Sequence, residues 1–156
     1  MASVESTDER IERVVSEWPG VGVGPHRFGG REYRVGGVSD AESRHGRVAE
    51  GREFGRTHGD EQVDIPYPVA LRDPLVAASR TSPHHLYPDS GWVSFYLGQD
   101  GDAADALTLL RLSYLWHVAA LQRRGPSLLD TVPVAAELAA LNVEPGVRAV
   151  FDRVLD

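Results

Sequence analysis

A short turn between two strand patterns is the feature that most constrains this fold. Residues 47–58 and 62–66 have the composition of β-strands, and only residues 59–61, Gly-Asp-Glu, separate them. Glycine and aspartate tolerate turn geometry, so the run predicts a hairpin. Parallel neighbours would need a crossover of a dozen residues or more. The centre of the chain is therefore predicted to form antiparallel strands.

Further strand patterns extend this sheet. Residues 83–87 and 91–97 flank the turn-forming run Pro-Asp-Ser-Gly at 88–91 and predict a second hairpin. Residues 30–35 predict another strand, and residues 20–25 predict either a strand or a tight connection. Together these patterns predict an antiparallel sheet of about four to six strands built from hairpins.

Helical patterns precede and follow the strands. Apolar side chains recur at helical spacing over residues 8–18, 69–79, 102–123, 133–141 and 145–155. Ser6 and Glu9 have capping-box spacing at the start of the first helix. Because strands and helices do not alternate as βαβ units, we predict one α+β domain over residues 1–156 with helices packed on one face of the sheet. Residues 126–156 form its C-terminal helical extension.

The charge and composition of the chain exclude several classes of function. The net charge is −7 and all 16 basic residues are arginine, so an acidic surface that repels phosphate backbones is expected and nucleic acid is not an expected partner. Cysteine is absent, which excludes a thiol nucleophile and cysteine-ligated zinc. No apolar run approaches the roughly 20 residues that span a bilayer, and the polar N-terminus argues against a secretory signal. We expect an acidic, cytoplasmic protein with no membrane partner.

His58 and Asp64 are the first candidate site residues. His58 ends a predicted strand beside the turn, where imidazole suits a general base or a ligand. Asp64 lies between Val63 and Ile65, and if those two face the core, its carboxylate faces the other side of the sheet. A contact across the hairpin would fix the imidazole tautomer and raise its basicity. The alternatives are a turn histidine that caps the backbone and a carboxylate on a solvated sheet face.

The second predicted hairpin adds two adjacent imidazoles, His84 and His85. Neighbours in a strand point to opposite faces, so we expect only one of them to reach the side of His58. Ordinary strand histidines are the alternative. One face of the following strand carries three side chains assigned to substrate binding: Trp92, Ser94 and Tyr96.

Histidine and aspartate are also the ligand types of zinc sites. A site built from His58, Asp64 and one of His84 or His85 would have suitable donors, but no close-spaced pattern such as His-x-x-x-His is present. We therefore predict no metal and no other cofactor, and assign these four residues to catalysis.

Four stretches of the chain together resemble a known family. They read Arg-Glu-Phe-Gly-Arg-Thr-His-Gly-Asp at 52–60, Val-Asp-Ile-Pro at 63–66, Pro-His-His-Leu-Tyr-Pro-Asp-Ser-Gly-Trp-Val-Ser-Phe at 83–95 and Ala-Leu-Thr-Leu-Leu-Arg-Leu-Ser-Tyr at 106–114. From about residue 52 to residue 116 the chain resembles the luciferase-domain family, mostly uncharacterised small proteins of archaea, bacteria and fungi. The likeness extends distantly to fungal luciferase.

The resemblance implies a pocket for a small molecule and an oxidation that needs no flavin or metal, because fungal luciferase oxidises a hydroxylated styryl-pyrone with molecular oxygen. It aligns His58 with a histidine of that enzyme and residues 84–92 with a His-Pro segment before a tryptophan strand. The fungal pattern has further histidines where this chain has Glu61, Asp64 and Pro66. These departures argue against light emission.

Three functions therefore stay open, and the weakest of them is metal-dependent hydrolysis through the same histidines. The first is a cofactor-independent, oxygenase-like enzyme for a small enolic or aromatic substrate, with His58 as general base, Asp64 orienting it, and His84 or His85 donating a hydrogen bond to the oxyanion. The second is a non-catalytic module that binds a small molecule or a protein.

Overall fold

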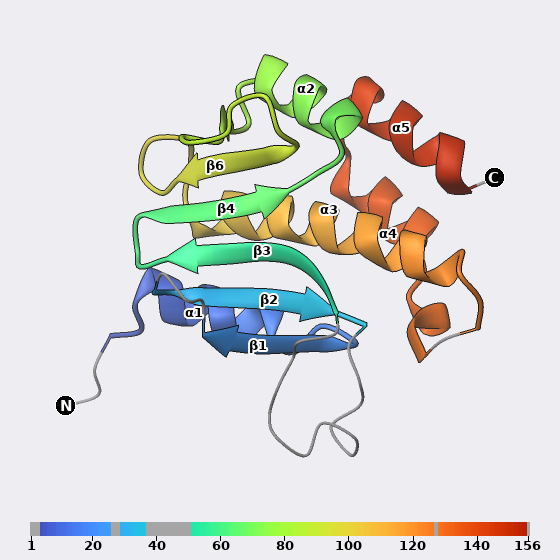
Figure 1. The fold of residues 1–156 in the computed structure, drawn as a ribbon, viewed down its shortest axis with the longest axis horizontal. Helices are drawn as coiled ribbons and strands as arrows, with labels where there is room; N and C mark the ends of the chain where they lie inside the picture. The colour runs from blue at the N-terminus through green and yellow to red at the C-terminus, as the bar shows by residue number, and fades with distance from the viewer. Residues whose placement is uncertain (1–3, 26–28, 37–50, 127, 156) are drawn as a thin grey trace.

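The computed structural model describes residues 4–25, 29–36, 51–126 and 128–155, and shows a sheet covered by helices (Figure 1). The strands are β1 (Val21–Pro25), β2 (Arg31–Val35), β3 (Arg52–His58), β4 (Gln62–Pro66), β5 (Ser82–Pro83) and β6 (Trp92–Tyr96). The helices are α1 (Thr7–Val15), α2 (Val69–Ala77), α3 (Ala103–Gln122), α4 (Val134–Leu141) and α5 (Pro145–Leu155), with a 3₁₀ turn at Leu128–Thr131.

The six strands form one antiparallel sheet in the order β1-β2-β3-β4-β6-β5. The long helix α3 runs along one face of this sheet and contacts β2, β3 and β4, while α1, α4 and α5 contact α3 from the same side (Figure 1). The prediction of an α+β fold with helices packed on one face is confirmed.

Two capping boxes set where helices begin. The Ser6 side chain accepts from the backbone N–H of Glu9, whose own side chain accepts from Ser6, and Asp102 and Asp105 repeat the arrangement at the start of α3. Such reciprocal bonds satisfy backbone donors that the first turn of a helix leaves unpaired. The first helix ends at Val15, earlier than the predicted residue 18.

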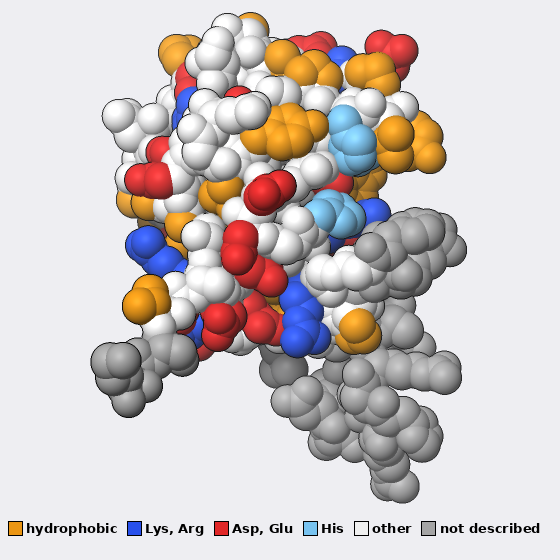
Figure 2. All heavy atoms as spheres, turned by 90° about the vertical axis from the view of Figure 1, so that its left-hand side faces the viewer, with side chains coloured by type: hydrophobic (Ala, Val, Ile, Leu, Met, Phe, Trp, Pro, Cys, Tyr) orange, Lys and Arg blue, Asp and Glu red, His pale blue; other side chains and the backbone are white. Residues whose placement is uncertain are grey.

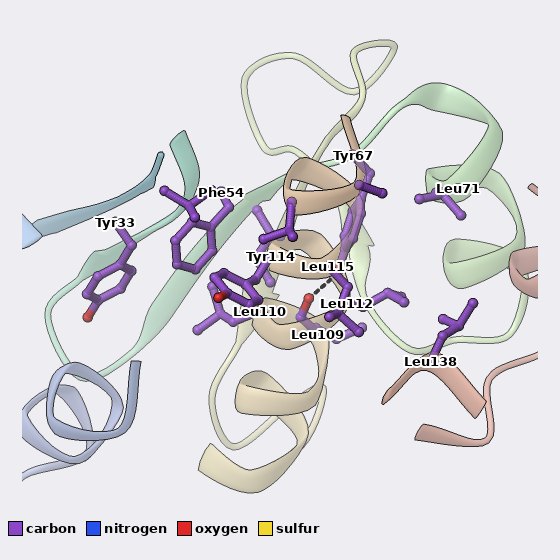
Figure 3. Close-up of a cluster of buried hydrophobic side chains, with 14 of the residues drawn as sticks. Tyr33, Phe54, Tyr67, Leu71, Leu109, Leu110, Leu112, Tyr114, Leu115 and Leu138 are labelled. Carbon is purple, nitrogen blue, oxygen red and sulfur yellow. Dashed lines mark hydrogen bonds between the residues drawn. The ribbon is translucent and has the colours of Figure 1, made fainter. Parts of the chain in front are cut away.

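The core lies between α3 and the sheet. Its aromatic part joins Phe54 to Trp18, Tyr33 and Tyr114, with ring centroids 5.5–6.2 Å from Phe54. Figure 3 shows Phe54 with Tyr33 and Tyr114. The hydroxyl of Tyr67 donates to the Leu109 carbonyl over 2.5 Å. These contacts fix how α3 sits on the sheet.

A bulge in β3 controls which side chains leave the core. Tyr33 pairs with Gly55 and Arg34 with Glu53, so Phe54 is the extra residue and both Phe54 and Gly55 are buried. A Cβ at Gly55 would lie 2.3 Å from Leu110 Cδ2, so the absence of a side chain lets α3 approach. Beyond the bulge the alternation of β3 resumes, and His58 faces away from the helices.

One strand prediction was wrong. Residues 83–87 do not form a strand, because only Ser82 and Pro83 pair with β6. Proline has no N–H to continue a ladder, the backbone N–H of His85 donates to the Ser94 hydroxyl, and those of Leu86 and Tyr87 donate to the Nδ1 atom of His84 at 3.1 and 3.2 Å. The chain therefore leaves the sheet at His84 and crosses residues 84–91 as a loop, which we call the histidine loop. The start of the predicted strand 47–58 lies outside the described residues.

Across the described ranges, none of the helices combines the length and apolarity needed to cross a bilayer.

Candidate functional site

Asp64 is the centre of the candidate site. It pairs with Arg56 on one side and Ser94 on the other, in the middle of β4. Its neighbours Val63 and Ile65 are fully buried against the helices, so strand alternation places Asp64 on the opposite face. The histidine loop covers that face, and Asp64 is only 1% exposed. A carboxylate buried in this way needs hydrogen-bond donors around it.

Four side chains supply those donors. The Nε2 atom of His58 lies 3.0 Å and that of His84 3.3 Å from Oδ2 of Asp64. The Gln62 amide and the Ser94 hydroxyl each donate to Oδ1 over 2.9 Å. Two donors on each oxygen occupy the acceptor positions that a carboxylate has. Asp64 therefore holds together three segments of the chain: the β3–β4 hairpin, β6 and the histidine loop.

His58 reaches Asp64 across the tight hairpin. It pairs with Gln62 in the sheet, which sets its side chain diagonally from Asp64 on the same face. The side chain is 28% exposed, whereas that of Asp64 is almost fully enclosed. The contact between imidazole and carboxylate that the hairpin suggested is present.

The expectation that only one of the paired histidines reaches this side was wrong. Because His84 and His85 lie in a loop and not in a strand, both rings turn toward Asp64 and stack with centroids 4.5 Å apart. The Nδ1 atom of His85 lies 3.2 Å from both Gln62 Nε2 and Ser94 Oγ. The two imidazoles thus belong to a single cluster with His58 and Asp64.

The hydrogen bonds of His84 assign its tautomer. Nδ1 accepts from the backbone N–H groups of Leu86 and Tyr87, so the proton of the neutral ring is on Nε2 and is donated to Asp64. Burial lowers the pKa of His84, although Asp64 opposes that shift, so the neutral ring is favoured near pH 7. His84 is therefore a fixed hydrogen-bond donor to Asp64.

The two neighbours of His85 place opposite demands on its Nδ1 atom. Gln62 presents its NH₂ group to Asp64, and the second N–H of that group faces Nδ1 of His85. Toward Gln62 the Nδ1 atom accepts, whereas Ser94 Oγ, which donates its own hydrogen to Asp64, can only accept from Nδ1, so these contacts are compatible with either tautomer. Unlike His84, His85 is exposed. It is the paired histidine that a ligand can approach.

The three residues assigned to substrate binding have different surroundings. Ser94 is fully buried, and its hydroxyl donates to Asp64, so it stabilises the cluster and is not accessible to a substrate. Trp92 is partly buried beside the His84 ring, and the guanidinium of Arg56 lies 4.2 Å above its ring centroid. Tyr96 pairs with Gln62 at the end of the same face. Trp92 and Tyr96 therefore border the cluster, and Ser94 lies inside it.

Sequence reasoning missed Gln62 and Arg56. Both lie two residues from a predicted site residue in the same strand, Gln62 before Asp64 and Arg56 before His58. The alternation that placed Asp64 and His58 on the open face places these two there as well. Arg56 also forms a paired contact with Glu53, at 2.8 and 3.0 Å.

The cluster has side chains of the metal-binding type, but the hydrogen bonds of His84 are incompatible with a metal on its Nε2 atom. Ligand atoms of Asp64, His84 and His85 lie within 4.8 Å of one another. A metal on Nε2 of His84 would move the ring proton to Nδ1, against the two backbone N–H groups that already point there. The arrangement instead fits a hydrogen-bonded cluster organised by Asp64.

A hollow of about 460 Å³ lies nearby at the strand ends. Its lining includes Thr7, Asp60, Leu97 and Asp102, and none of the cluster residues. Figure 2 shows the end of the molecule that carries the turns, with histidine side chains at the surface and acidic side chains gathered beside them.

Comparisons with known proteins bear on the segment that contains this cluster. Residues 51–113, about two fifths of the chain, match the family model described as the luciferase domain. The matched segment contains the whole cluster around Asp64. No curated protein matches the chain, and neither does any solved structure. The resemblance to the luciferase-domain family is thus confirmed over residues 51–113.

Proposed function

We propose that the protein is a small enzyme that removes a proton from an enolic or aromatic substrate, with His58 as the general base. The observation that supports this most is the 3.0 Å contact between His58 Nε2 and the buried carboxylate of Asp64. A carboxylate that accepts from one imidazole nitrogen fixes the tautomer and stabilises the imidazolium that forms when the other nitrogen takes a proton.

In this proposal Asp64 orients and does not itself react. Both of its oxygens already accept two hydrogen bonds each, and it is 1% exposed. His58 takes the substrate proton, and its Nε2 contact with Asp64 stabilises the imidazolium that forms.

The anion left on the substrate needs a hydrogen-bond donor. His84 is committed to Asp64 through Nε2, whereas the exposed His85 faces the cluster through Nδ1 and, in its Nε2–H tautomer, keeps a donor for a ligand. We therefore assign to His85 the hydrogen bond that stabilises the substrate oxyanion. From the sequence, either His84 or His85 could have had this role. Trp92 and Tyr96 form the aromatic border against which a flat substrate would lie.

The likeness to the luciferase-domain family suggests how the reaction continues. The electron-rich carbon of the enolate would form a C–O bond to molecular oxygen, which accepts the electron pair, and the peroxide anion would take back the proton held by His58. Substrate and oxygen thus combine into a hydroperoxide, and the balance requires no flavin or metal. This is the oxygenase-like activity that we assign to the site.

Oxygen uptake with a panel of hydroxy-pyrones, β-diketones and electron-rich phenols tests the proposal. We expect wild type to consume oxygen with at least one of them and His58→Ala to lose about 100-fold or more in kcat, in line with a missing general base. Leu86→Ala, an exposed change beside the paired histidines, is the matched control and should keep wild-type turnover.

Thermal melting separates catalysis from structure. If His58→Ala lowers the melting temperature and leaves turnover of the folded fraction unchanged, His58 is structural and the proposal fails. Saturable binding of a panel compound without oxygen uptake or product would instead favour the non-catalytic binding module.

A further inference from the structure

The histidine loop is held from outside the cluster by one arginine. Arg72 lies on α2, and its Nη1 group donates to the carbonyls of Pro88 and Ser90 over 3.0 and 2.5 Å. We infer that Arg72 is a positioning residue for the candidate site, which it serves by fixing the loop that carries His84 and His85. This inference rests on the proposed function for its kinetic part only.

The geometry gives Arg72 a firm hold on the loop. Its side chain is 16% exposed, and Nε and Nη2 both donate to Oδ1 of Asp73 over 3.0 and 2.7 Å. Asp73 thereby orients the planar guanidinium so that Nη1 meets both loop carbonyls. Because Asp73 itself is 62% exposed, water screens the ion pair, and the main effect of the Arg72 side chain is on the loop.

The held carbonyls lie close to the point where the loop returns to the sheet. Gly91 accepts from the backbone N–H of Tyr67 over 3.1 Å, and a Cβ at Gly91 would be 1.8 Å from the Tyr67 oxygen. Ser90, whose carbonyl Arg72 binds, donates both its N–H and its hydroxyl to the Tyr87 carbonyl. By holding Ser90, Arg72 therefore also restricts the position of Tyr87.

From Tyr87 the chain of contacts leads to the imidazoles. The backbone N–H of Tyr87 is one of the two donors that define the tautomer of His84, and the Tyr87 ring stacks on His84 with centroids 5.5 Å apart. His84 in turn donates to Asp64 and stacks on His85. Loss of Arg72 should thus loosen the donors at His84 Nδ1 without touching any atom of the cluster.

The test compares Arg72→Ala with Arg80→Ala in the full chain. Arg80 follows the same helix, and its side chain pairs over 2.8 Å with Glu144, which is not part of the histidine loop, so its removal is a matched loss of a partly buried arginine. Long-range nitrogen NMR spectra of the imidazole rings report the tautomer of each histidine. We expect wild type and Arg80→Ala to show His84 as the pure Nε2–H form, and Arg72→Ala to show averaged or shifted His84 nitrogens.

Arg72→Lys sharpens the result, because one ammonium can still donate to both carbonyls. We expect it to restore the wild-type His84 signals at least in part, whereas Arg72→Gln should not. The inference is overturned if Arg72→Ala keeps the wild-type His84 and His85 signals, or changes them no more than Arg80→Ala does.

The kinetic readout adds to the spectra. With a substrate in hand, Arg72→Ala should lower kcat by about tenfold or more with little change in KM, as misplaced catalytic groups do. If wild type shows no turnover with any compound, the proposed function fails, and the His84 spectra alone still decide whether Arg72 positions the loop.

Discussion

On the helix side of the sheet the side chains interlock as apolar groups, whereas on the opposite side they converge on one charge. Val63, Ile65, Val93 and Phe95 are fully buried against the helices. The residues between them, Asp64 and Ser94, are buried as deeply, but on the face that the histidine loop covers. Apolar packing is non-directional and spread over many contacts, while the polar face depends on directed bonds to a single residue.

The two faces of the sheet therefore differ in how they tolerate substitutions. An apolar core side chain contacts many neighbours, so the free-energy cost of truncating it depends on how many of these contacts are lost. The polar face has one acceptor group for four donors, so its failure should be nearly all-or-none for the local structure. The following substitutions test that difference.

The largest loss of stability is expected on the helix side, from Phe54→Ala. Phe54 is fully buried among Trp18, Tyr33 and Tyr114, and truncation of a buried phenylalanine costs about 3–5 kcal/mol. Urea unfolding measures the change in free energy, and exposed Leu86→Ala should stay within about 0.5 kcal/mol of wild type. A cost for Phe54→Ala as small as the control would contradict this account of the core.

On the polar side, Asp64→Asn should cost about 3 kcal/mol. The amide would bring an NH₂ group against donors that now face a carboxylate, which leaves buried donors without acceptors. Unfolding in urea gives the stability, and nitrogen spectra should show that His58 and His84 both change. The exposed Asp89→Asn is the control. If the His58 signals stay as in wild type, Asp64 is not the organising group.

A buried histidine outside the cluster gives a smaller, pH-dependent effect. Burial lowers the pKa of His117 to about 4, and its Nδ1 accepts from Arg52 Nε over 3.0 Å. Since the unfolded chain binds the proton near pH 6.5 and the fold does not, stability is complete above that pH and falls as the pH approaches 4. The loss between pH 7 and pH 5 should be about 2 kcal/mol.

His117→Gln isolates that contribution, because its side-chain oxygen can still accept from Arg52. We expect its unfolding free energy to fall less than that of wild type between pH 7 and pH 5. The lowered pKa of His84 adds to the decline in the same direction and remains in the variant. Equal declines in the two proteins would show that His117 is not the group responsible.

The smallest loss of stability is expected from Gly91→Ala, where the histidine loop returns to the sheet. The added methyl would lie 1.8 Å from the Tyr67 carbonyl oxygen, so the backbone must shift, at a cost of roughly 1–2 kcal/mol. Gly24→Ala in β1 meets nothing within 4 Å and is the matched control. Because Gly91 ends the histidine loop, we also expect a shift of the His84 nitrogen signals. Unchanged signals would show that the conformation at Gly91 does not affect His84.

Most of the fold could be predicted because it follows repeating local patterns. The capping box at Ser6 and Glu9 and the helical spacing of apolar residues placed the helices, and the turn at 59–61 placed the hairpin that brings His58 to Asp64. Each of these signals lies within a few residues, so it can be read without knowledge of the rest of the chain.

The histidine loop could not be predicted in this way. The strand rule put His84 and His85 on opposite faces, but Pro83 interrupts the ladder and the His84 ring itself accepts from the backbone N–H groups of Leu86 and Tyr87. That competition between side chain and strand depends on a carboxylate 20 residues earlier in the sequence and on Arg72 in another helix. The shape of such a loop is decided by distant contacts, and composition alone does not reveal them.

The short β5 strand has a consequence for how copies of this protein meet one another. A long unpaired edge strand invites a second chain to add to the sheet, which is a common route to aggregation. Here one edge strand has two residues and includes Pro83, and the other, β1, contains two glycines and ends at Pro25. Within the part of the chain that the structure describes, neither edge strand offers a long, proline-free row of backbone donors, so both are poor templates for the addition of a strand from a neighbouring molecule.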